Sequence, residues 1–302
     1  MKAMIMAAGF GTRLKPLTDH IPKALVPVLN RPILERNIEY LAEYGIKDII
    51  INAHYHMEQM ECYIKGCKIP GVNLSISLEP DEILGTGGGL SKCRPFLKDD
   101  TFILINSDIL TDIHLDQAIK SHMGSGAIVT MVLHDFQRFN QVEVINNTVT
   151  KIHRDIAPGR FAFTGIHVLS PHIFDWLPPK GYSDIISECY TPMIESGKTI
   201  NTHMATGHYW HDTGTIESYK MANKDLLEVE NKRFIKGKNT CIDPSVKLIN
   251  WVIIGNNVCI GKDTIIENSI IWDDVAIGKE MYIKDSIVIS DDVIIHTSQG
   301  SR

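Results

Sequence analysis

Apolar runs alternate with helical patterns through the first third of this 302-residue chain. Four short apolar segments are typical of buried strands: 3–8, 48–53, 72–78 and 101–106. Three segments between or before these strands have the periodicity of helices: 32–44, 56–65 and 86–93. Strands separated by helices predict an α/β fold, a Rossmann-like and mostly parallel sheet flanked by helices on both faces.

The middle of the chain is less regular. Residues 127–170 are rich in strand signals, 183–197 have a helical pattern, and 217–231 predict a connecting helix. On open α/β sheets, ligands bind beyond the carboxyl ends of the strands. The loop 9–13 and Asp108 both follow strands, so we expect them at that edge.

The last third has a period of six residues. The repeating positions are Ile253, Cys259, Ile265, Ile271, Ile277, Ile283, Ile289 and Ile295. This period fits neither an α-helix nor an alternating strand, and it is typical of a small left-handed parallel β-helix of hexapeptide repeats. A chance run of β-hairpins is the alternative. We therefore expect a domain at 1–225, a linker at 226–240 and a β-helix at 241–302.

Charge limits the partners of the protein. The net charge is −6, which argues against nucleic acid or an anionic membrane surface. Residues 1–36 are instead basic, which suggests that a small anionic ligand binds there. The segment contains two acidic residues, Asp19 and Glu35, and six basic ones: Lys2, Arg13, Lys15, Lys23, Arg31 and Arg36. Scattered cysteines without a C-x-x-C pair, and no apolar run long enough for a signal peptide or membrane span, predict a cytoplasmic protein.

A glycine-containing loop follows the first strand. It reads Ala8-Gly9-Phe10-Gly11-Thr12-Arg13. Glycines let backbone amides approach phosphate oxygens, and an arginine can bind two of those oxygens at once. The loop matches neither a dinucleotide fingerprint nor a P-loop. On these residues alone, an ordinary strand-to-loop turn explains the pattern equally well.

The next residues extend this loop into a long motif. Leu17-Thr18 is followed by Pro22-Lys23-Ala24-Leu25-Val26-Pro27. The whole segment resembles the signature G-x-G-T-R-L-x-P-L-T and P-K-A-L-x-P of the sugar-phosphate nucleotidyltransferases. The resemblance implies transfer of a nucleotidyl group from a nucleoside triphosphate to a sugar 1-phosphate, with release of pyrophosphate. It implies that Ala8, Gly9, Gly11 and Thr12 bind the nucleotide, and that Arg13 and Lys23 neutralise the triphosphate.

A second glycine-rich segment resembles the family's base-binding element. It contains Gly85, Thr86 and Gly87, and three adjacent glycines are poor helix formers. We expect this backbone to run against the base and ribose. Upstream, Glu79 stands near a position where relatives have a base-reading glutamine. A carboxylate accepts hydrogen bonds only, so it would suit guanine better than uracil. An exposed loop acid is an equally good reading of Glu79.

Two further motifs resemble the family's metal ligands. Asp108 ends the buried segment 103–108, and Asp212 lies in Trp210-His211-Asp212-Thr213-Gly214-Thr215. The resemblance implies that both aspartates hold a catalytic Mg²⁺, which prefers carboxylate oxygens and keeps phosphate oxygens and waters as other ligands. A helix N-cap and a turn acid are the structural alternatives. No cysteine or serine nucleophile is indicated.

The sugar-binding side departs from the family pattern. Thr164 and Gly165 resemble the pair that contacts the sugar. The usual Glu-Lys-Pro, whose lysine binds the sugar phosphate, is missing, and Arg154 is a candidate replacement, though its guanidinium is planar and bulkier. Arg154 could equally be a surface residue.

Three functions compete. The first is a transferase, with guanylyl transfer to mannose or heptose 1-phosphate ahead of uridylyl or thymidylyl transfer. The second is a non-catalytic homologue that binds a nucleotide sugar. The third adds acyl transfer by the β-helix, which its short length and single histidine, His296, disfavour. We expect the β-helix to form a homo-oligomer.

Overall fold

The computed structural model describes residues 1–297; residues 298–302, the end of the expected 241–302 domain, lie outside the described residues. The chain forms two compact units. The first unit comprises Met1–Gly11, His20–Leu25 and Leu34–Asp212. The second comprises Thr12–Asp19, Val26–Ile33 and the chain from Thr213 on. The signature segment around Lys23 is therefore shared between the two.

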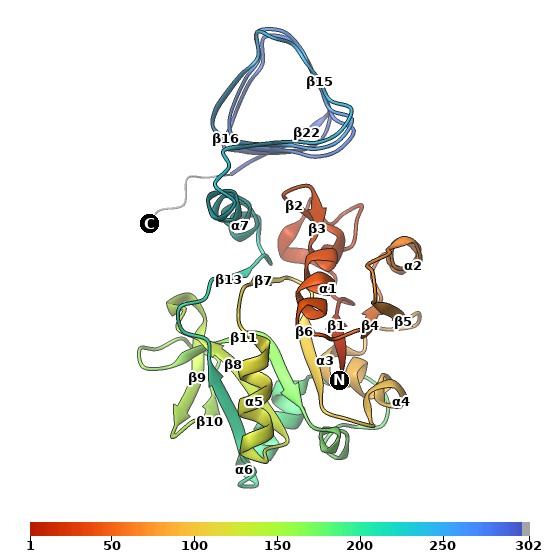
Figure 1. The fold of residues 1–302 in the computed structure, drawn as a ribbon, viewed down its shortest axis with the longest axis vertical. Coiled ribbons are helices and arrows are strands. Elements are labelled where there is room, and N and C mark those ends of the chain that lie inside the picture. The colour runs from red at the N-terminus through yellow and green to blue at the C-terminus, as the bar shows by residue number, and fades with distance from the viewer. Residues whose placement is uncertain (298–302) are drawn as a thin grey trace. The chain divides into compact units, whose positions relative to one another are not determined.

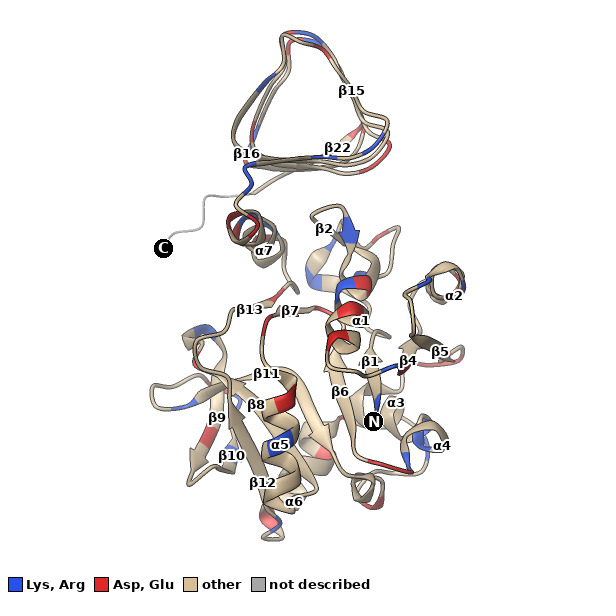
Figure 2. Cartoon of the chain, viewed as in Figure 1, with Lys and Arg blue, Asp and Glu red and all other residues tan. Residues whose placement is uncertain are grey.

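A nine-stranded sheet is the centre of the first unit (Figure 1). Its spatial order is β5 (Asn73–Leu78), β4 (Asp48–Ala53), β1 (Lys2–Met6), β6 (Phe102–Asn106), β11 (Phe161–Leu169), β8 (Val129–His134), β12 (Ile200–Met204), β10 (Thr148–Ile152) and β9 (Asn140–Ile145). The first four strands are parallel, as their apolar patterns predicted. Strands β6 and β8 contain no Lys, Arg, Asp or Glu, and Figure 2 shows them entirely tan.

The other half of the sheet is mixed, whereas the sequence predicted a mostly parallel sheet. Strand β11 is antiparallel to both β6 and β8, and β10 is antiparallel to β9 and β12. A tight turn at Asn146 and Asn147, both with positive φ, joins β9 to β10. Two-residue hairpins of this kind impose antiparallel pairing, because a parallel pair needs a long crossover.

Helices cover both faces of the sheet. One core contains side chains of α1 (Ile33–Glu43), α2 (Met57–Gly66) and α5 (Leu115–Ser125). The opposite core contains side chains of α3 (Gly85–Lys92), α4 (Arg94–Leu97) and α6 (Thr191–Glu195). Strand β1 supplies Ala3 and Ile5 to the first core and Met4 to the second, because neighbouring side chains on a strand point to opposite faces. Only the second half of the expected helix 183–197 is α-helical, after a π-helical turn at Ile186–Tyr190.

The second unit contains a three-sided coil of parallel strands (Figure 1). These are β14 (Phe234–Lys236), β15 (Cys241–Ile242), β16 (Lys247–Ile254), β17 (Cys259–Ile260), β18 (Ile265–Ile271), β19 (Ala276–Ile277), β20 (Tyr282–Lys284) and β21 (Ser286–Ser290). Strand β14 lies within the expected linker 226–240 and already pairs with β16. The last strand, β22 (Val293–His296), reverses direction and pairs antiparallel with β21.

The buried apolar series of the coil differs from the six-residue series read in the sequence. It runs Ile254, Ile260, Ile266, Ile271, Ile277, Ile283 and Val288. The spacing shortens to five residues twice. Accordingly, paired positions such as Lys247 and Ile265 differ by 18 residues, whereas Ile270 and Ile287 differ by 17. Cys259, which the sequence series includes, is therefore exposed.

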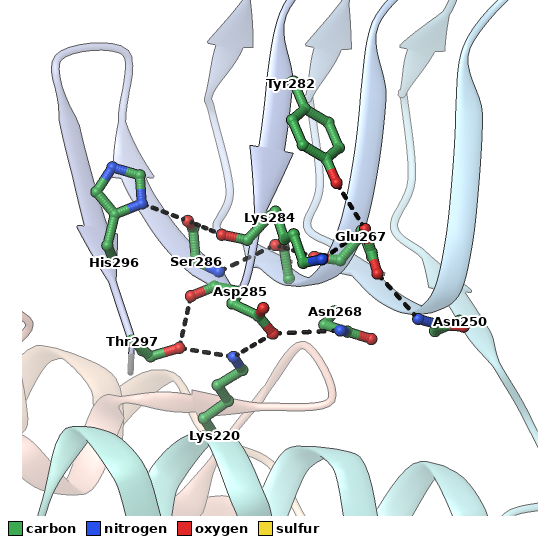
Figure 3. A network of polar contacts seen from close by, with 11 residues as sticks. Lys220, Asn250, Glu267, Asn268, Tyr282, Lys284, Asp285, Ser286, His296 and Thr297 are labelled. Atoms are coloured by element: carbon green, nitrogen blue, oxygen red, sulfur yellow. Dashed lines mark hydrogen bonds and ion pairs between the residues drawn. The ribbon is translucent and has the colours of Figure 1, made fainter. Parts of the chain in front are cut away.

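Helix α7 (Ile216–Val229) precedes the coil in the sequence and forms hydrogen bonds with it. The Lys220 ammonium donates to Asp285 Oδ1 at 3.2 Å and to Thr297 Oγ1 at 2.6 Å, as Figure 3 shows. Burial lowers the pKa of Lys220, and the hydrogen bond to Asp285 opposes that shift. A half-buried ammonium with two oxygen partners fixes this helix against the strand ends.

The same helix also holds the signature segment that follows Lys23. This segment contains β2 (Pro27–Val28) and β3 (Arg31–Pro32). Buried Asn223 accepts from the Leu29 N–H at 2.9 Å, and the Tyr219 hydroxyl donates to Pro27 O at 2.6 Å. Asn30 Nδ2 donates to Ile254 O of the coil at 2.7 Å. The coil is thus attached to the polypeptide that follows the signature lysine.

The remaining strands, β7 (Ile109–Thr111) and β13 (Trp210–Asp212), form a separate two-stranded pair. Among residues 1–297, no helix is long and apolar enough to cross a membrane.

Candidate active site

A cavity of about 190 Å³ lies at the carboxyl ends of β1, β4 and β6. We call it the phosphate-loop cavity. Its lining residues are Met6, Ala7, Ala8, Gly9, Lys23, Asn52, Ile83, Gly85, Thr86, Asn106, Ser107 and Asp108. The cavity therefore brings together six residues that the sequence analysis selected: Ala8, Gly9, Lys23, Gly85, Thr86 and Asp108.

Backbone pairing explains why the loop after β1 meets the end of β6. Met6 and Asn106 are register partners, so both strands end at the same level. Ser107 N–H donates to Met6 O at 3.1 Å, and Asn37 Nδ2 on α1 donates to Ser107 O at 3.0 Å. The residue after Ser107, Asp108, is fixed at the edge of the sheet by these bonds.

Lys23 and Asp108 form an ion pair at this cavity. Their side chains are only 15% and 13% exposed, so solvent screens this pair less than it would screen a surface pair. The pair therefore places one positive and one negative group in the lining of the cavity that also contains Gly9 of the glycine loop.

Strand pairing brings the segment that contains Asp212 to the strand that follows Asp108. Strand β13 runs antiparallel to β7, and Asp212 is the register partner of Ile109, the residue after Asp108. The two acids are 104 positions apart in the sequence, and the ladder places Asp212 opposite the residue that follows Asp108. Within residues 1–297 there is no cluster of three or more His, Cys, Asp or Glu that could hold a metal.

A second cavity of about 410 Å³ adjoins the first at Asn106, which lines both. We call it the β11 cavity. It is lined by Asn106, Ile109, Met131, Phe139, Gln141, Val142, Ile152, His153, Arg154, Phe163, Thr164, Gly165, Ile186, Trp210 and Asp212. Arg154, Thr164, Gly165 and Asp212, all selected from the sequence, thus line one space.

Gly165 is needed where β11 passes Asn106. Its φ is +80°, and a Cβ there would lie 2.7 Å from Asn106 Nδ2. The Thr164 hydroxyl donates to Val132 O at 2.8 Å, and Thr164 O accepts from Trp210 Nε1 at 2.9 Å. Thr164 therefore anchors this wall of the β11 cavity through its hydrogen bonds, and Gly165 lets the backbone pass close to Asn106.

The β11 cavity also contains polar residues that the sequence analysis did not select. His153 Nε2 lies 3.0 Å from Glu143 Oε2, and Gln141 Nε2 donates to Arg154 O at 2.7 Å. The hydrogen bond from His153 lowers the pKa of Glu143. On the same strand as Gly165, burial lowers the pKa of His167 to about 3, so this histidine is neutral near pH 7.

The glycines of α3 pack against protein, whereas the sequence analysis assigned them to a ligand. A Cβ on Gly87 would lie 2.6 Å from Ser183 Oγ, and one on Gly88 would lie 2.2 Å from Gly181 O. The N–H groups of both glycines donate to Ser183 O, at 2.8 and 3.2 Å. Thr86 Oγ1 accepts from Ile185 N–H at 2.9 Å. The glycine run is thus required mainly by the close approach of residues 181–185.

Glu79 is buried, with 1% of its surface exposed. Its Oε1 accepts from Asn52 Nδ2 at 2.8 Å, and its Oε2 accepts from Leu84 N–H at 2.9 Å. Both carboxylate oxygens already have protein donors, unlike those of an exposed loop acid. Gly11, within the glycine loop, has a φ of +64°, and Thr12 and Arg13 begin a short 3-10 turn, Thr12–Leu14, of the second unit.

These features define a class of protein before any relative is considered. A glycine loop after the first strand, with an ion pair of Lys23 and Asp108 at the carboxyl edge of the sheet, is typical of an α/β enzyme that handles phosphate groups. Residues 2–229 match the family model described as "Nucleotidyl transferase". The chain belongs to this family and is an enzyme of the sugar-1-phosphate nucleotidyltransferase type.

Relatives of two kinds are similar over most of the chain. The mannose-1-phosphate guanyltransferase of Debaryomyces hansenii is 32% identical, covering 82% of this chain and 73% of the relative. The one from Schizosaccharomyces pombe is also 32% identical, covering 87% and 74%. A UTP–glucose-1-phosphate uridylyltransferase of Synechocystis is 27% identical, covering 90% and 83%.

Solved structures share the fold. A putative glucose-1-phosphate thymidylyltransferase from Bacillus anthracis, in complex with a sucrose, superposes with a TM-score of 0.66 at 23% identity, covering 74% of this chain and 94% of that one. HddC from Yersinia pseudotuberculosis, complexed with GMP-PN, gives 0.64 at 24% identity, covering 74% and 99%.

The packing of α3 predicts the effect of Gly88→Ala. The added methyl group meets the Gly181 carbonyl, so we expect the free energy of unfolding to fall by about 1–3 kcal/mol, as for other overpacked sites. Urea denaturation measures this change. Gly66→Ala is the matched control, because a Cβ at this helical glycine meets nothing within 4 Å. Equal stability of the two variants would contradict the packing role of Gly88.

Proposed function

We propose that the protein transfers a nucleotidyl group from a nucleoside triphosphate to a sugar 1-phosphate in a Mg²⁺-dependent reaction. The observation that carries this proposal is the ion pair of Lys23 and Asp108 at the phosphate-loop cavity, with Asp212 in the lining of the adjoining β11 cavity. Family membership supports the reaction class. The adjoining β11 cavity offers space for a second substrate next to the first.

Each chemical group in the reaction has a candidate partner in the chain. A phosphate oxygen of the sugar 1-phosphate attacks the α-phosphorus, and pyrophosphate leaves from the opposite side. The phosphate is already a nucleophile, so the protein needs no covalent intermediate and contributes positioning and charge. The amides of Ala8, Gly9, Gly11 and Thr12 would bind phosphate oxygens, while Lys23 and Arg13 offset their charge.

The donor set near Asp108 fits magnesium. Carboxylates are the ligands that Mg²⁺ prefers, and the ion takes its other ligands from phosphate and water. The register of Asp212 with Ile109, the residue after Asp108, supports a shared role for the two acids. Asp108 and Asp212 would hold the ion, which would supply charge neutralisation at the triphosphate. In the structure Lys23 pairs with Asp108, and a bound triphosphate would give that ammonium an alternative anionic partner.

The sugar phosphate would bind in the β11 cavity. Arg154 is exposed at its wall, with His153 as its neighbour there. The guanidinium can bind two phosphate oxygens together, which a single lysine ammonium cannot match in geometry. Thr164 and Gly165 would contact the sugar from β11.

For the substrates, we propose guanylyl transfer to mannose or heptose 1-phosphate. Relatives at 32% identity are named mannose-1-phosphate guanyltransferases, and a structural neighbour was crystallised with GMP-PN. Uridylyl or thymidylyl transfer is the alternative, which the Synechocystis relative and the Bacillus structure support.

We further propose that the coil is a left-handed β-helix that joins subunits, and that the chain divides into a transferase domain at 1–225, a connecting segment at 226–240 and the β-helix from 241 on. Large apolar side chains remain exposed on or beside the coil: Phe234, Ile249, Met281, Tyr282 and Val293. We propose that these side chains form the contact with the other subunit.

The reaction predicts pyrophosphate release with Mg²⁺. GTP, UTP, dTTP, CTP and ATP are tested against mannose, glucose, N-acetylglucosamine, N-acetylmuramic acid and heptose 1-phosphates. We expect turnover for one pair, with GTP favoured, and a loss of about 10²–10³-fold in kcat for Asp108→Asn. Asp175→Asn changes an exposed aspartate outside both cavities and serves as the control. Silence across the matrix from folded protein that binds nucleotide would favour a non-catalytic homologue.

The subunit contact predicts a multiple of the 33.9 kDa chain mass in light scattering. Substituting Met281→Glu on the coil should shift the mass toward one chain, because burying an unpaired charge at an interface is costly. A wild-type protein that is a monodisperse monomer would refute the oligomer.

A further inference from the structure

A continuous series of hydrogen bonds links the two sides of the phosphate-loop cavity. Ala7 N–H, in the loop after β1, donates to Asn52 Oδ1 at 2.7 Å. Asn52 Nδ2 donates to Glu79 Oε1 at 2.8 Å, and Leu84 N–H donates to Glu79 Oε2 at 2.9 Å. We call this series the Asn52–Glu79 relay. It joins the glycine loop to the residue that immediately precedes Gly85 and Thr86.

The relay is closed off from solvent. Asn52 is 0% exposed and Glu79 is 1% exposed. Helix α3 packs directly over it, since a Cβ on Gly89 would lie 2.9 Å from Asn52 Nδ2 and 3.0 Å from Glu79 Oε1. Hydrogen bonds in such surroundings are strong, and a buried carboxylate that loses a donor is penalised heavily.

The polarity of the relay is fixed by the chemistry of its members. Two backbone N–H groups at its ends require acceptors, and an ionised carboxylate can only accept. A side-chain amide placed between Ala7 and Glu79 can accept from one side and donate to the other. Asn52 therefore meets a requirement that an aspartate at this position would fail while Glu79 is ionised.

The geometry points to Asn52 and Glu79 as positioning residues that set the spacing between the glycine loop and the segment at Gly85 and Thr86, and hence the affinity for the nucleoside triphosphate. This inference rests on the proposed function, because it assigns the triphosphate to the phosphate-loop cavity. It replaces direct base reading by Glu79, whose two oxygens are already engaged. The relay should affect all nucleotides alike, whereas a base-reading residue discriminates between them.

A swap of chemical groups tests the relay. Calorimetry measures the Kd of the wild type and its variants for GTP and for UTP, each with Mg²⁺ and without sugar phosphate. In Asn52→Asp a carboxylate faces Glu79, and we expect both Kd values to rise about 10- to 100-fold. Asn52→Ala removes both bonds of the amide and should weaken both nucleotides in the same direction.

The double variant Asn52→Asp with Glu79→Gln restores the relay with its groups exchanged. The amide introduced by Glu79→Gln then donates to the new carboxylate, and the carbonyl oxygen of that amide accepts from Leu84 N–H. We expect both Kd values to return to within about threefold of the wild type, a coupling that only interacting neighbours show. Glu79→Gln alone should weaken GTP and UTP by the same factor.

Asn73→Asp is the matched control. Asn73 Nδ2 donates to Asp48 Oδ1 at 2.9 Å between the neighbouring strands β5 and β4, but this pair is exposed and lies at the opposite ends of those strands. Its Kd values should stay within about twofold of the wild type, because solvent screens exposed like charges. A thermal unfolding scan of every variant separates loss of fold from loss of affinity.

Three outcomes would overturn the relay. They are unchanged Kd values in folded Asn52→Asp, no recovery in the double variant, or a changed GTP-to-UTP ratio in Glu79→Gln, which would return Glu79 to base reading. Failure of the proposed function looks different. Nucleotide binding that follows the relay, without pyrophosphate release from any substrate pair, would keep the relay and reject catalysis. A wild type that binds neither nucleotide would overturn both.

Discussion

The antiparallel pairing of β7 with β13 is the constraint on which the candidate active site depends. It places Asp212 opposite Ile109, the residue after Asp108, although the chain between them forms most of the antiparallel half of the sheet. Asp212 reaches this position only when β13 pairs with β7. Because β11 packs between β6 and β8, the β11 cavity opens beside the same ladder, and Asn106 borders both cavities.

Much of this arrangement could be predicted from the sequence, and the limits have physical causes. The parallel strands β1, β4 and β6 contain continuous apolar runs, and β5 alternates apolar and polar residues, so these patterns were sufficient to predict the strands. The antiparallel half depends on tight turns and long-range pairing, which no local period encodes. The buried series of the coil shortens twice by one residue, and only the register of neighbouring strands reveals that change.

The residues of the site also divide into those that a local sequence pattern predicts and those that depend on partners distant in sequence. Gly9, Lys23 and Asp108 could be predicted because a contiguous motif carries them. The environment of Glu79 and of Gly87 could not, because Asn52 and Ser183, their partners, are distant in sequence. Asn52 had no signal of its own, since an asparagine near a strand end is common and its two partners are known only from the fold. Even so, its relay links the two loops between which the nucleotide is proposed to bind.

The central claim is that Asp108 and Asp212 hold one metal ion. Its most direct test is to measure Mn²⁺ affinity in the presence of GTP by electron paramagnetic resonance, for the wild type, Asp108→Asn, Asp212→Asn and the double variant. If both carboxylates hold one ion, each single variant should lose about 10- to 100-fold in Mn²⁺ affinity. The affinity of the double variant should then be little lower than that of the single variant with the larger loss. Wild-type Mn²⁺ affinity in either single variant would contradict a shared site for Asp108 and Asp212.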